Sequence, residues 1–182
     1  VTLNNLYNLI KGFILLQDGI IYDPFESINK QNDILIKDGK IIEIKKNILK
    51  KSNYKIIDCS KCIITNGFID LHAHFREPGF EFKENLITGS HSAFYGGYTR
   101  VCTMPNTNPV IDTPELVNYI IDKSQKLPIY IYPIGAITKG QKGQELAEIG
   151  QMVDKGAVAI SDDGIPVHNS QIMRFALEYA KQ

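Results

Sequence analysis

Residues 67–79, Gly-Phe-Ile-Asp-Leu-His-Ala-His-Phe-Arg-Glu-Pro-Gly, decide the fold and the chemistry that the sequence predicts. An apolar run typical of a buried strand ends in His72-Ala73-His74, and a charged loop closed by Pro and Gly follows. Side chains alternate between the two faces of a strand, so His72 and His74 point the same way. Two imidazoles that point the same way at the end of a strand can bind one metal ion. The alternative is that the two histidines lie on this strand by chance.

The overall composition is that of an ordinary globular protein. The chain has 182 residues, of which 43% are hydrophobic and 22% charged, and its formal net charge is zero. A neutral chain gives no electrostatic case for binding nucleic acid or an anionic membrane. No apolar run approaches the roughly 20 residues of a membrane-spanning helix.

The cysteines favour a cytoplasmic location. There are 3 of them, an odd number, which argues against a disulfide framework and for a reducing compartment. Cys59 and Cys62 form a C-x-x-C pair, but no second pair or nearby histidine accompanies them. We therefore interpret both as small apolar residues near a strand.

The first third of the chain predicts a small all-β unit, with residues 1–12 as an extension. Short β segments are expected at 13–16, 20–22, 33–37, 40–44, 54–58 and 62–65. Turns are expected at 17–19 and at Asp38-Gly39. In the hairpin around Asp38, the alternation of Ile34 and Ile36 with Ile42 and Ile44 predicts one buried and one solvated face.

From residue 67 onward, strands and helices alternate. Strands are expected at 68–72, 99–104, 129–134 and 157–161, and helices at 83–95, 113–126, 144–155 and from Gln171 to Gln182. Such alternation predicts an α/β unit with parallel strands and right-handed crossovers, as in a doubly wound sheet or a (β/α)8 barrel. No Gly-x-Gly-x-x-Gly follows the first strand, which favours the barrel. A barrel needs about 250 residues, so only its first half is expected here.

Polar residues follow three of these strands. The first gives His72, His74 and Arg76, the second gives Asn106, and the fourth gives Asp162 and Asp163. The carboxyl ends of barrel strands meet at one face, where barrel enzymes keep their active sites. Two imidazoles and a carboxylate suit Zn²⁺, and a carboxylate can bridge two metal ions. A guanidinium suits a substrate carboxylate, and an asparagine suits an amide edge.

Structural alternatives exist for each of these residues. Arg76 could pair with Glu77 on the surface, Asn106 could be an ordinary loop former, and Asp162-Asp163-Gly164 could be a simple turn. The joint placement at the same end of successive strands favours the functional interpretation. His91 and His168 are interpreted as non-ligands, because neither follows a strand beside a partner.

Three motifs, at 67–79, 104–109 and 160–164, resemble those of bacterial dihydroorotases in the cyclic amidohydrolase superfamily. The similarity runs from about Phe13 to the last residue. It implies the first half of a metal-dependent hydrolase (β/α)8 barrel over 67–182, preceded over 1–66 by part of a small β-sandwich. It implies His72, His74 and Asp163 as metal ligands, with two Zn²⁺ in the complete site, and Arg76 and Asn106 as substrate-binding residues.

The resemblance also implies a reaction and partners. The reaction is the reversible cyclisation of N-carbamoyl-L-aspartate to L-dihydroorotate in pyrimidine biosynthesis, and the partners are a homodimer mate or aspartate transcarbamoylase. Asn66 departs from the family, which usually has Pro before Gly-Phe-Ile-Asp. The family's further metal-binding histidines, its proton-transferring catalytic Asp and barrel strands five to eight are expected beyond Gln182. The 182-residue chain alone is therefore expected to show no turnover and to bind zinc weakly.

Two alternatives stay open at this stage. The first is a hydantoinase, dihydropyrimidinase or allantoinase. These enzymes resemble the same fold but typically carry a metal-bridging lysine at strand four. This chain has Asp162-Asp163 there, and the nearest lysine, Lys155, precedes the strand. The other alternative is an inactive truncated homologue or a scaffold subunit for aspartate transcarbamoylase. The set of metal- and substrate-type residues argues against it, because a scaffold has no need of them.

Overall fold

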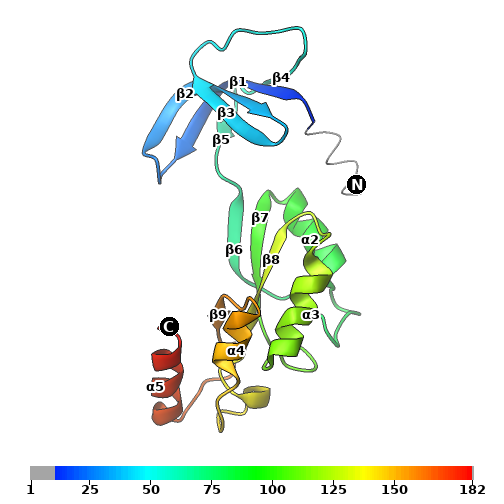
Figure 1. Cartoon of the computed structure of the whole chain (residues 1–182), viewed down its shortest axis with the longest axis vertical. Coiled ribbons are helices and arrows are strands. Elements are labelled where there is room, and N and C mark those ends of the chain that lie inside the picture. Colours follow the sequence, from blue (N-terminus) through cyan, green and yellow to red (C-terminus); the bar gives the residue numbers. More distant parts are fainter. Residues whose placement is uncertain (1–10, 182) are drawn as a thin grey trace. The chain divides into compact units, whose positions relative to one another are not determined.

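A computed structural model describes residues 11–181 and divides the chain into two compact units at the Asn66–Gly67 junction (Figure 1). Each unit has its own sheet, and each is described by itself. The extension predicted over residues 1–12 falls almost entirely outside the described residues. Within residues 11–181, no helix is long and apolar enough to cross a membrane.

The first unit is a five-stranded sheet. β1 (Phe13–Asp23), β2 (Ile28–Lys37) and β3 (Lys40–Lys45) form an antiparallel meander, while β4 (Tyr54–Asp58) and β5 (Ile63–Ile64) both pair in parallel with β1. The predicted turn at Asp38-Gly39 joins β2 to β3, and both residues have positive φ, 48° and 79°. Asp and Gly suit such a turn because they tolerate this conformation at low cost.

The turn predicted at residues 17–19 is wrong. β1 runs through this stretch as one strand, and its register with β2 shifts between Leu16 and Gly19. The irregularity is a β-bulge in which Asp18 has a φ of 61°. The buried Asp33 on β2 holds it, because its Oδ1 accepts from Asp18 N at 2.8 Å and its Oδ2 from Ile48 N at 2.8 Å.

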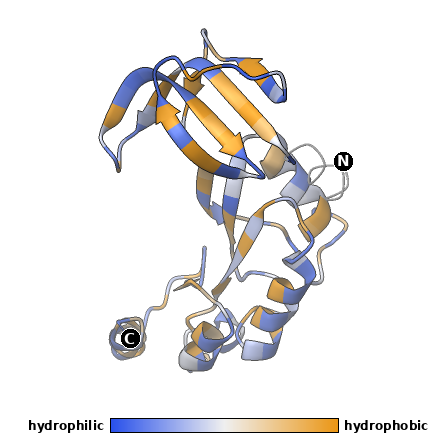
Figure 2. Cartoon of the chain, turned by 45° about the horizontal axis from the view of Figure 1, so that its top comes forward, coloured by the Kyte–Doolittle hydropathy of each residue, from blue (hydrophilic) through white to orange (hydrophobic). Residues whose placement is uncertain are grey.

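The single buried face predicted for the β2–β3 hairpin is also wrong. On β2, Ile34 and Leu35 lie on opposite faces, yet both are only 4% exposed. On β3, Ile42 and Ile44 are exposed. Figure 2 colours long stretches of these strands as hydrophobic. Strand alternation alone therefore does not identify the covered face of this sheet.

The second unit is built on a parallel sheet. Its strands are β6 (Phe68–Ala73), β7 (Tyr98–Thr103), β8 (Tyr130–Gly135) and β9 (Ala159–Ile160), paired in chain order. The connecting helices are α2 (Leu86–Tyr95), α3 (Pro114–Ser124) and α4 (Ile149–Asp154), and α5 (Ser170–Tyr179) follows β9. Parallel neighbours in sequential order are the arrangement that the alternating pattern predicts.

The helices α2 and α3 lie on one side of this sheet (Figure 1). Val101 of β7 and Ile131 of β8 pack there with Leu86, Val117 and Met152 from the helices. The next residues along these strands point to the opposite face, where a smaller apolar cluster lies. It contains Cys102, Met104, Ile134 and Tyr132.

The helix predicted over residues 144–155 starts later, at Ile149. The preceding stretch folds back against the loop after β8: Lys139 N donates to Glu145 O and Ala147 N to Ile137 O, and Thr138 and Leu146 form an isolated bridge. A short 3-10 turn, η1 (Lys139–Gln141), lies inside this loop. These backbone hydrogen bonds replace those that a longer helix would make, and pattern alone does not show them.

The last helix is shorter than the sequence predicts. It was expected from Gln171 to Gln182, whereas α5 ends at Tyr179 and Ala180 is its C-cap. Ala180 N donates to Ala176 O and Lys181 N to Glu178 O, so the chain turns once more after the helix. Gln182 lies outside the described residues, and the part of the prediction that falls on it is not tested.

Candidate functional site

The two histidines at the end of β6 lie side by side. Their Nε2 atoms are 3.3 Å apart, and their rings make an edge-to-face contact. His72 lies within β6, and its backbone N donates to Asp70 Oδ1 at 3.0 Å. The His72 side chain is 60% exposed and that of His74 is 27% exposed. Solvent therefore reaches both histidine side chains, and reaches His72 more than His74.

Asp163, in the loop after β9, faces both histidines. Its Oδ1 is 3.1 Å from His72 Nε2 and 3.8 Å from His74 Nε2, and its side chain is 14% exposed. Its φ of 51° is in the left-handed region, and its backbone N donates to Ser161 Oγ at 2.9 Å. The chain thus turns sharply after β9 and directs this carboxylate toward β6.

Asn106, in the loop after β7, lies between two of these groups. Its Oδ1 is 2.9 Å from His74 Nδ1, and its Nδ2 donates to Asp163 Oδ2 at 2.7 Å, across 57 positions of the chain. Residues from the ends of β6, β7 and β9 are thereby joined in one polar cluster. The cluster consists of His72, His74, Asn106 and Asp163.

The donor set fits a metal ion. Within residues 11–181, His72, His74 and Asp163 are the one group of three potential ligands whose ligand atoms lie within 4.8 Å of one another. Tetrahedral zinc with bonds of 2.0–2.1 Å separates its ligand atoms by about 3.3 Å. The observed separations of 3.1, 3.3 and 3.8 Å bracket this value. His91 and His168 are not part of the group.

Asp162 has a different role from its neighbour Asp163. It is only 3% exposed, and its carboxylate accepts from Ile137 N at 2.7 Å, Thr138 N at 3.1 Å and Thr138 Oγ1 at 2.5 Å. These donors lie in the loop after β8. Asp162 therefore ties that loop to the turn that carries Asp163.

Arg76 and Glu77 do not pair, so the surface ion pair considered for them is wrong. Glu77 is buried, and its carboxylate accepts from Lys123 Nζ, from Tyr119 Oη at 2.9 Å and from Leu86 N at 2.9 Å. Arg76 is half-buried with a φ of 62°. Among residues 11–181, its guanidinium makes no hydrogen bond or ion pair, so its donors remain free.

The Glu77–Lys123 pair shifts the pKa of both members. Burial by itself would raise the pKa of the Glu77 carboxyl, but the hydrogen bonds from Lys123, Leu86 and Tyr119 outweigh it and lower the pKa below its ordinary value. The hydrogen bond to Glu77 in turn raises the pKa of Lys123. Both groups are therefore charged at neutral pH, and the pair holds the loop after β6 against α3.

The loops after β6 and β7 are also joined backbone to backbone. Asn108 N donates to Pro78 O at 3.0 Å. Gly79 has a φ of 91°, and a Cβ placed on it would lie 1.9 Å from Asn108 O. Only glycine fits this approach. The segments that carry Arg76 and Asn106 are therefore in direct contact.

Comparisons with known proteins identify the family of this chain. The family described as "Dihydro-orotase-like" matches residues 61–182. The chain belongs to this family. A dihydroorotase of Citrifermentans bemidjiense is 47% identical over 169 residues, covering 92% of this chain and 40% of the relative. A dihydroorotase of Acetivibrio thermocellus is 49% identical over 168 residues, covering 92% of this chain and 39% of the relative.

Solved structures show the fold. An L-hydantoinase of Arthrobacter aurescens superposes with a TM-score of 0.69 at 22% identity, covering 88% of this chain and 36% of that one. A D-hydantoinase superposes with a TM-score of 0.71 at 20% identity, covering 93% and 38%. The predicted α/β fold, half of an amidohydrolase barrel with an N-terminal β unit, is thereby confirmed. The chain spans about 40% of the length of the curated dihydroorotases.

Sequence reasoning missed the residues that hold the candidate site in place. The sequence pattern presents Asp162 only together with its neighbour, as a ligand or a turn, and it indicates no role for Lys123 or Tyr119. Glu77 and Lys123 are 46 positions apart, so no local pattern connects them. The Asp162-Asp163 pair was the one available signal, because two adjacent carboxylates at a strand end point in different directions.

Proposed function

We propose that this chain forms the metal-binding half of a dihydroorotase active site. The reaction would be the reversible conversion of N-carbamoyl-L-aspartate to L-dihydroorotate and water. The convergence of His72, His74 and Asp163 carries this proposal, since it occurs in a member of the dihydro-orotase-like family. Curated relatives with the name dihydroorotase support the choice of substrate.

The proposed metal is Zn²⁺, two ions in the complete site. His72 and His74 would hold one ion through Nε2, and Asp163 would contribute Oδ1. When bound, the metal supplies Lewis acidity that activates water at neutral pH and polarises the ring carbonyl. The side chains of His72 and His74 are both partly exposed, which an ion and a substrate need in order to approach them.

Arg76 is proposed to bind the substrate carboxylate. It lies two residues beyond His74, and its free guanidinium can form a bidentate pair. The remaining Nδ2 hydrogen of Asn106 can donate to the same substrate. An acidic substrate favours dihydroorotate over a hydantoin. The nearest lysine, Lys155, caps the end of α4 instead of following β9, which also argues against a lysine-bridged site.

Four further assignments stay predictions: a homodimer, association with aspartate transcarbamoylase, a cytoplasmic location, and a proton-transferring Asp beyond Gln182. The expectation that residues 1–66 and 67–182 are separate portions of a sandwich and a barrel is likewise a proposal. It is supported by the compact units on either side of the Asn66–Gly67 junction.

A chimera tests the proposed activity. Residues 1–182 replace the matching segment of the Citrifermentans bemidjiense dihydroorotase, to which this chain is 47% identical. We expect the zinc-loaded chimera to interconvert N-carbamoyl-L-aspartate and L-dihydroorotate. His72→Ala and Asp163→Ala should each reduce kcat by at least about 100-fold, because each removes a metal ligand. Arg76→Met should raise KM more than it lowers kcat, because it removes substrate binding.

His168→Ala is the matched control, since this exposed histidine lies outside the cluster. It should leave turnover unchanged. Hydantoin and dihydrouracil are assayed in parallel. A chimera that opens these neutral rings but not dihydroorotate would contradict the proposal in favour of a hydantoinase. A folded, zinc-loaded chimera without any turnover would favour an inactive homologue.

A further inference from the structure

We infer that Asn106 is a positioning residue for the metal ligands His74 and Asp163, a role separate from any contact with substrate. The inference deepens the proposed function, because it rests on the metal site formed by His72, His74 and Asp163. Asn106 contacts two of these three side chains at once, at 2.9 and 2.7 Å. Its side-chain amide therefore determines how His74 and Asp163 orient the lone pairs that would bind the metal.

The orientation of the amide follows from Asp163. An ionised carboxylate can only accept hydrogen bonds. Asp163 Oδ2 lies 2.7 Å from one end of the Asn106 amide, so that end is the donating Nδ2. The other end, Oδ1, then faces His74 Nδ1 at 2.9 Å. The hydrogen-bond network thereby assigns the two ends of the amide.

The tautomer of His74 follows in turn. Asn106 Oδ1 can only accept, so His74 Nδ1 carries the proton and His74 Nε2 keeps its lone pair. His74 Nε2 is the nitrogen that lies 3.3 Å from His72 Nε2 and 3.8 Å from Asp163 Oδ1. Asp163 Oδ1, which Asn106 does not touch, also faces this point. Asn106 thus leaves one free ligand atom on each neighbour, and both are directed to the same place.

The two histidines differ in this respect. The His72 side chain is 60% exposed, and among residues 11–181 its Nδ1 makes no hydrogen bond. His74 is less exposed and is held through its second nitrogen. A ligating histidine commonly donates its other N–H to an oxygen acceptor, and loss of such a partner weakens metal binding about 10–100-fold. The single amide of Asn106 supplies this support to His74 and also restrains Asp163.

Cobalt binding to the 182-residue chain tests the inference. Co²⁺ is titrated and its visible absorption is followed, for the parent chain, Asn106→Ala and Asn106→Leu. We expect both variants to bind cobalt about 10–100-fold more weakly than the parent. Asn108→Ala is the matched control: it lies in the same loop, is exposed, and its side chain makes no hydrogen bond within the described residues. Folded Asn106 variants with the parent's affinity would overturn the inference and leave Asn106 a substrate-binding role alone.

A metal-free measurement decides the inference independently of any variant. Long-range ¹⁵N–¹H correlations of the histidine rings are recorded on the parent chain at about pH 8. We expect His74 to carry its proton on Nδ1. A proton on Nε2 would overturn the inference. A parent chain that binds no cobalt would contradict the metal site of the proposed function, whereas a parent chain that binds cobalt but carries the His74 proton on Nε2 would overturn the inference alone.

Discussion

The loop after β6 and the loop after β9 both place a candidate site residue beside a buried carboxylate, but the two carboxylates accept hydrogen bonds from different kinds of donor. Each presents a candidate site residue with positive φ, Arg76 at 62° and Asp163 at 51°. Each places a buried carboxylate directly beside it, Glu77 in the first loop and Asp162 in the second. Glu77 is satisfied largely by a cation, Lys123, whereas Asp162 is satisfied by neutral backbone and hydroxyl donors.

This difference indicates how adjacent residues divide their roles. One carboxylate of each loop is saturated by protein donors and fixes the backbone. The neighbouring residue keeps a polar group for the proposed ligand, the guanidinium of Arg76 in the first loop and Oδ1 of Asp163 in the second. The anchor at Glu77 depends on the charge of Lys123, whereas the anchor at Asp162 depends on the geometry of its neutral donors. Substitutions that remove charge but keep shape should therefore separate the two loops.

Asp162→Ala should have the largest effect. It leaves Ile137 N, Thr138 N and the Thr138 hydroxyl without their acceptor in a buried place, so we expect a loss of about 3 kcal/mol in unfolding free energy. Asp162→Asn keeps one acceptor oxygen for the two amides and should cost only about 1 kcal/mol. Denaturant unfolding gives both values, and amide exchange at Ile137 and Thr138 localises the loss. Equal losses in the two variants would show that this anchor also depends on charge.

Lys123→Met should have an intermediate effect. It keeps most of the packing of the stem but withdraws the cation from Glu77, which stays buried with Tyr119 and Leu86 N as its donors. We expect a loss of about 1–2 kcal/mol, since a buried carboxylate loses its charged partner but remains hydrogen-bonded. Exchange of the Leu86 amide should become faster. Lys126→Met, at an exposed lysine two residues beyond α3, is the control and should change neither quantity.

The Glu77 anchor should also respond to acid. The pKa of Glu77 is lowered in the folded chain, so its contribution is present above the ordinary value of 4.5 and is lost as the pH falls through the lower folded pKa. Unfolding free energy should therefore fall below about pH 4.5, and less steeply in Glu77→Gln. Unfolding curves between about pH 3 and pH 7 measure the slope. Identical slopes in the two proteins would rule out Glu77 as the responsible group.

The caps that end the two loops should have the smallest effect. Asn85 caps α2 by accepting from Ile87 N and Thr88 N, and Asn169 caps α5 by accepting from Gln171 N and Ile172 N. Replacement by Ala should cost about 1 kcal/mol at each position. Amide exchange within each helix measures the local opening. A loss at either cap that exceeds that of Asp162→Ala would contradict this order.

Local sequence patterns predicted the parts of the fold that depend on neighbours in the chain. The His72-Ala73-His74 strand end, the Asp38-Gly39 hairpin and the four strand–helix units follow from period, turn chemistry and alternation. The bulge at Asp18 and the late start of α4 did not follow, because Asp33 and the backbone around Ile137 determine them from a distance. These long-range contacts override the conformation that the local sequence favours.

The candidate site was predictable to a similar degree. The positions of His72 and His74 at the end of β6, and of Asn106 and Asp163 in the loops after β7 and β9, follow from strand order alone, because the carboxyl ends of parallel strands lie at one edge. Which aspartate of the pair turns inward did not follow from strand order. It depends on the donors that the loop after β8 offers to Asp162. Likewise, the burial of Glu77 depends on α3, which no pattern around Arg76 indicates.

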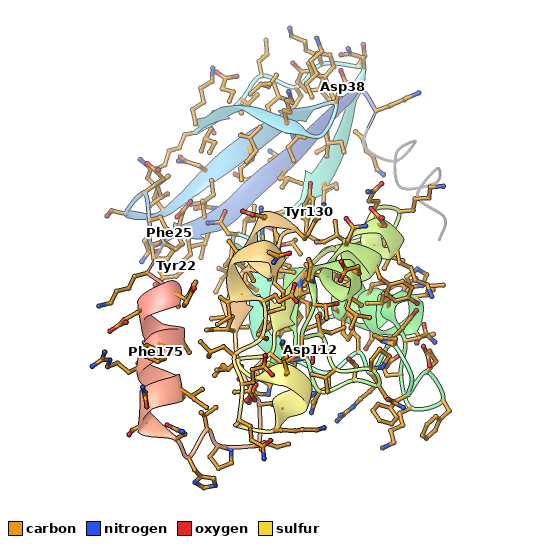
Figure 3. All side chains as sticks on the ribbon, turned by 60° about the horizontal axis from the view of Figure 1, so that its bottom comes forward. Tyr22, Phe25, Asp38, Asp112, Tyr130 and Phe175 are labelled. Carbon is orange, nitrogen blue, oxygen red and sulfur yellow. The ribbon has the colours of Figure 1, made fainter. Side chains whose placement is uncertain are left out.

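The contact between Gly79 and Asn108 has a practical consequence for engineering the substrate range. A designer who wishes to replace the proposed acidic substrate by a neutral ring would begin at the proposed substrate-binding residues, Arg76 and Asn106. Any side chain at position 79 would collide with Asn108 O, 1.9 Å from the added Cβ, and displace both loops together. Useful libraries should therefore randomise positions 76 and 106 as a pair, hold Gly79 constant, and exclude insertions between Pro78 and Phe80. Figure 3 shows the side chains of this unit on the ribbon.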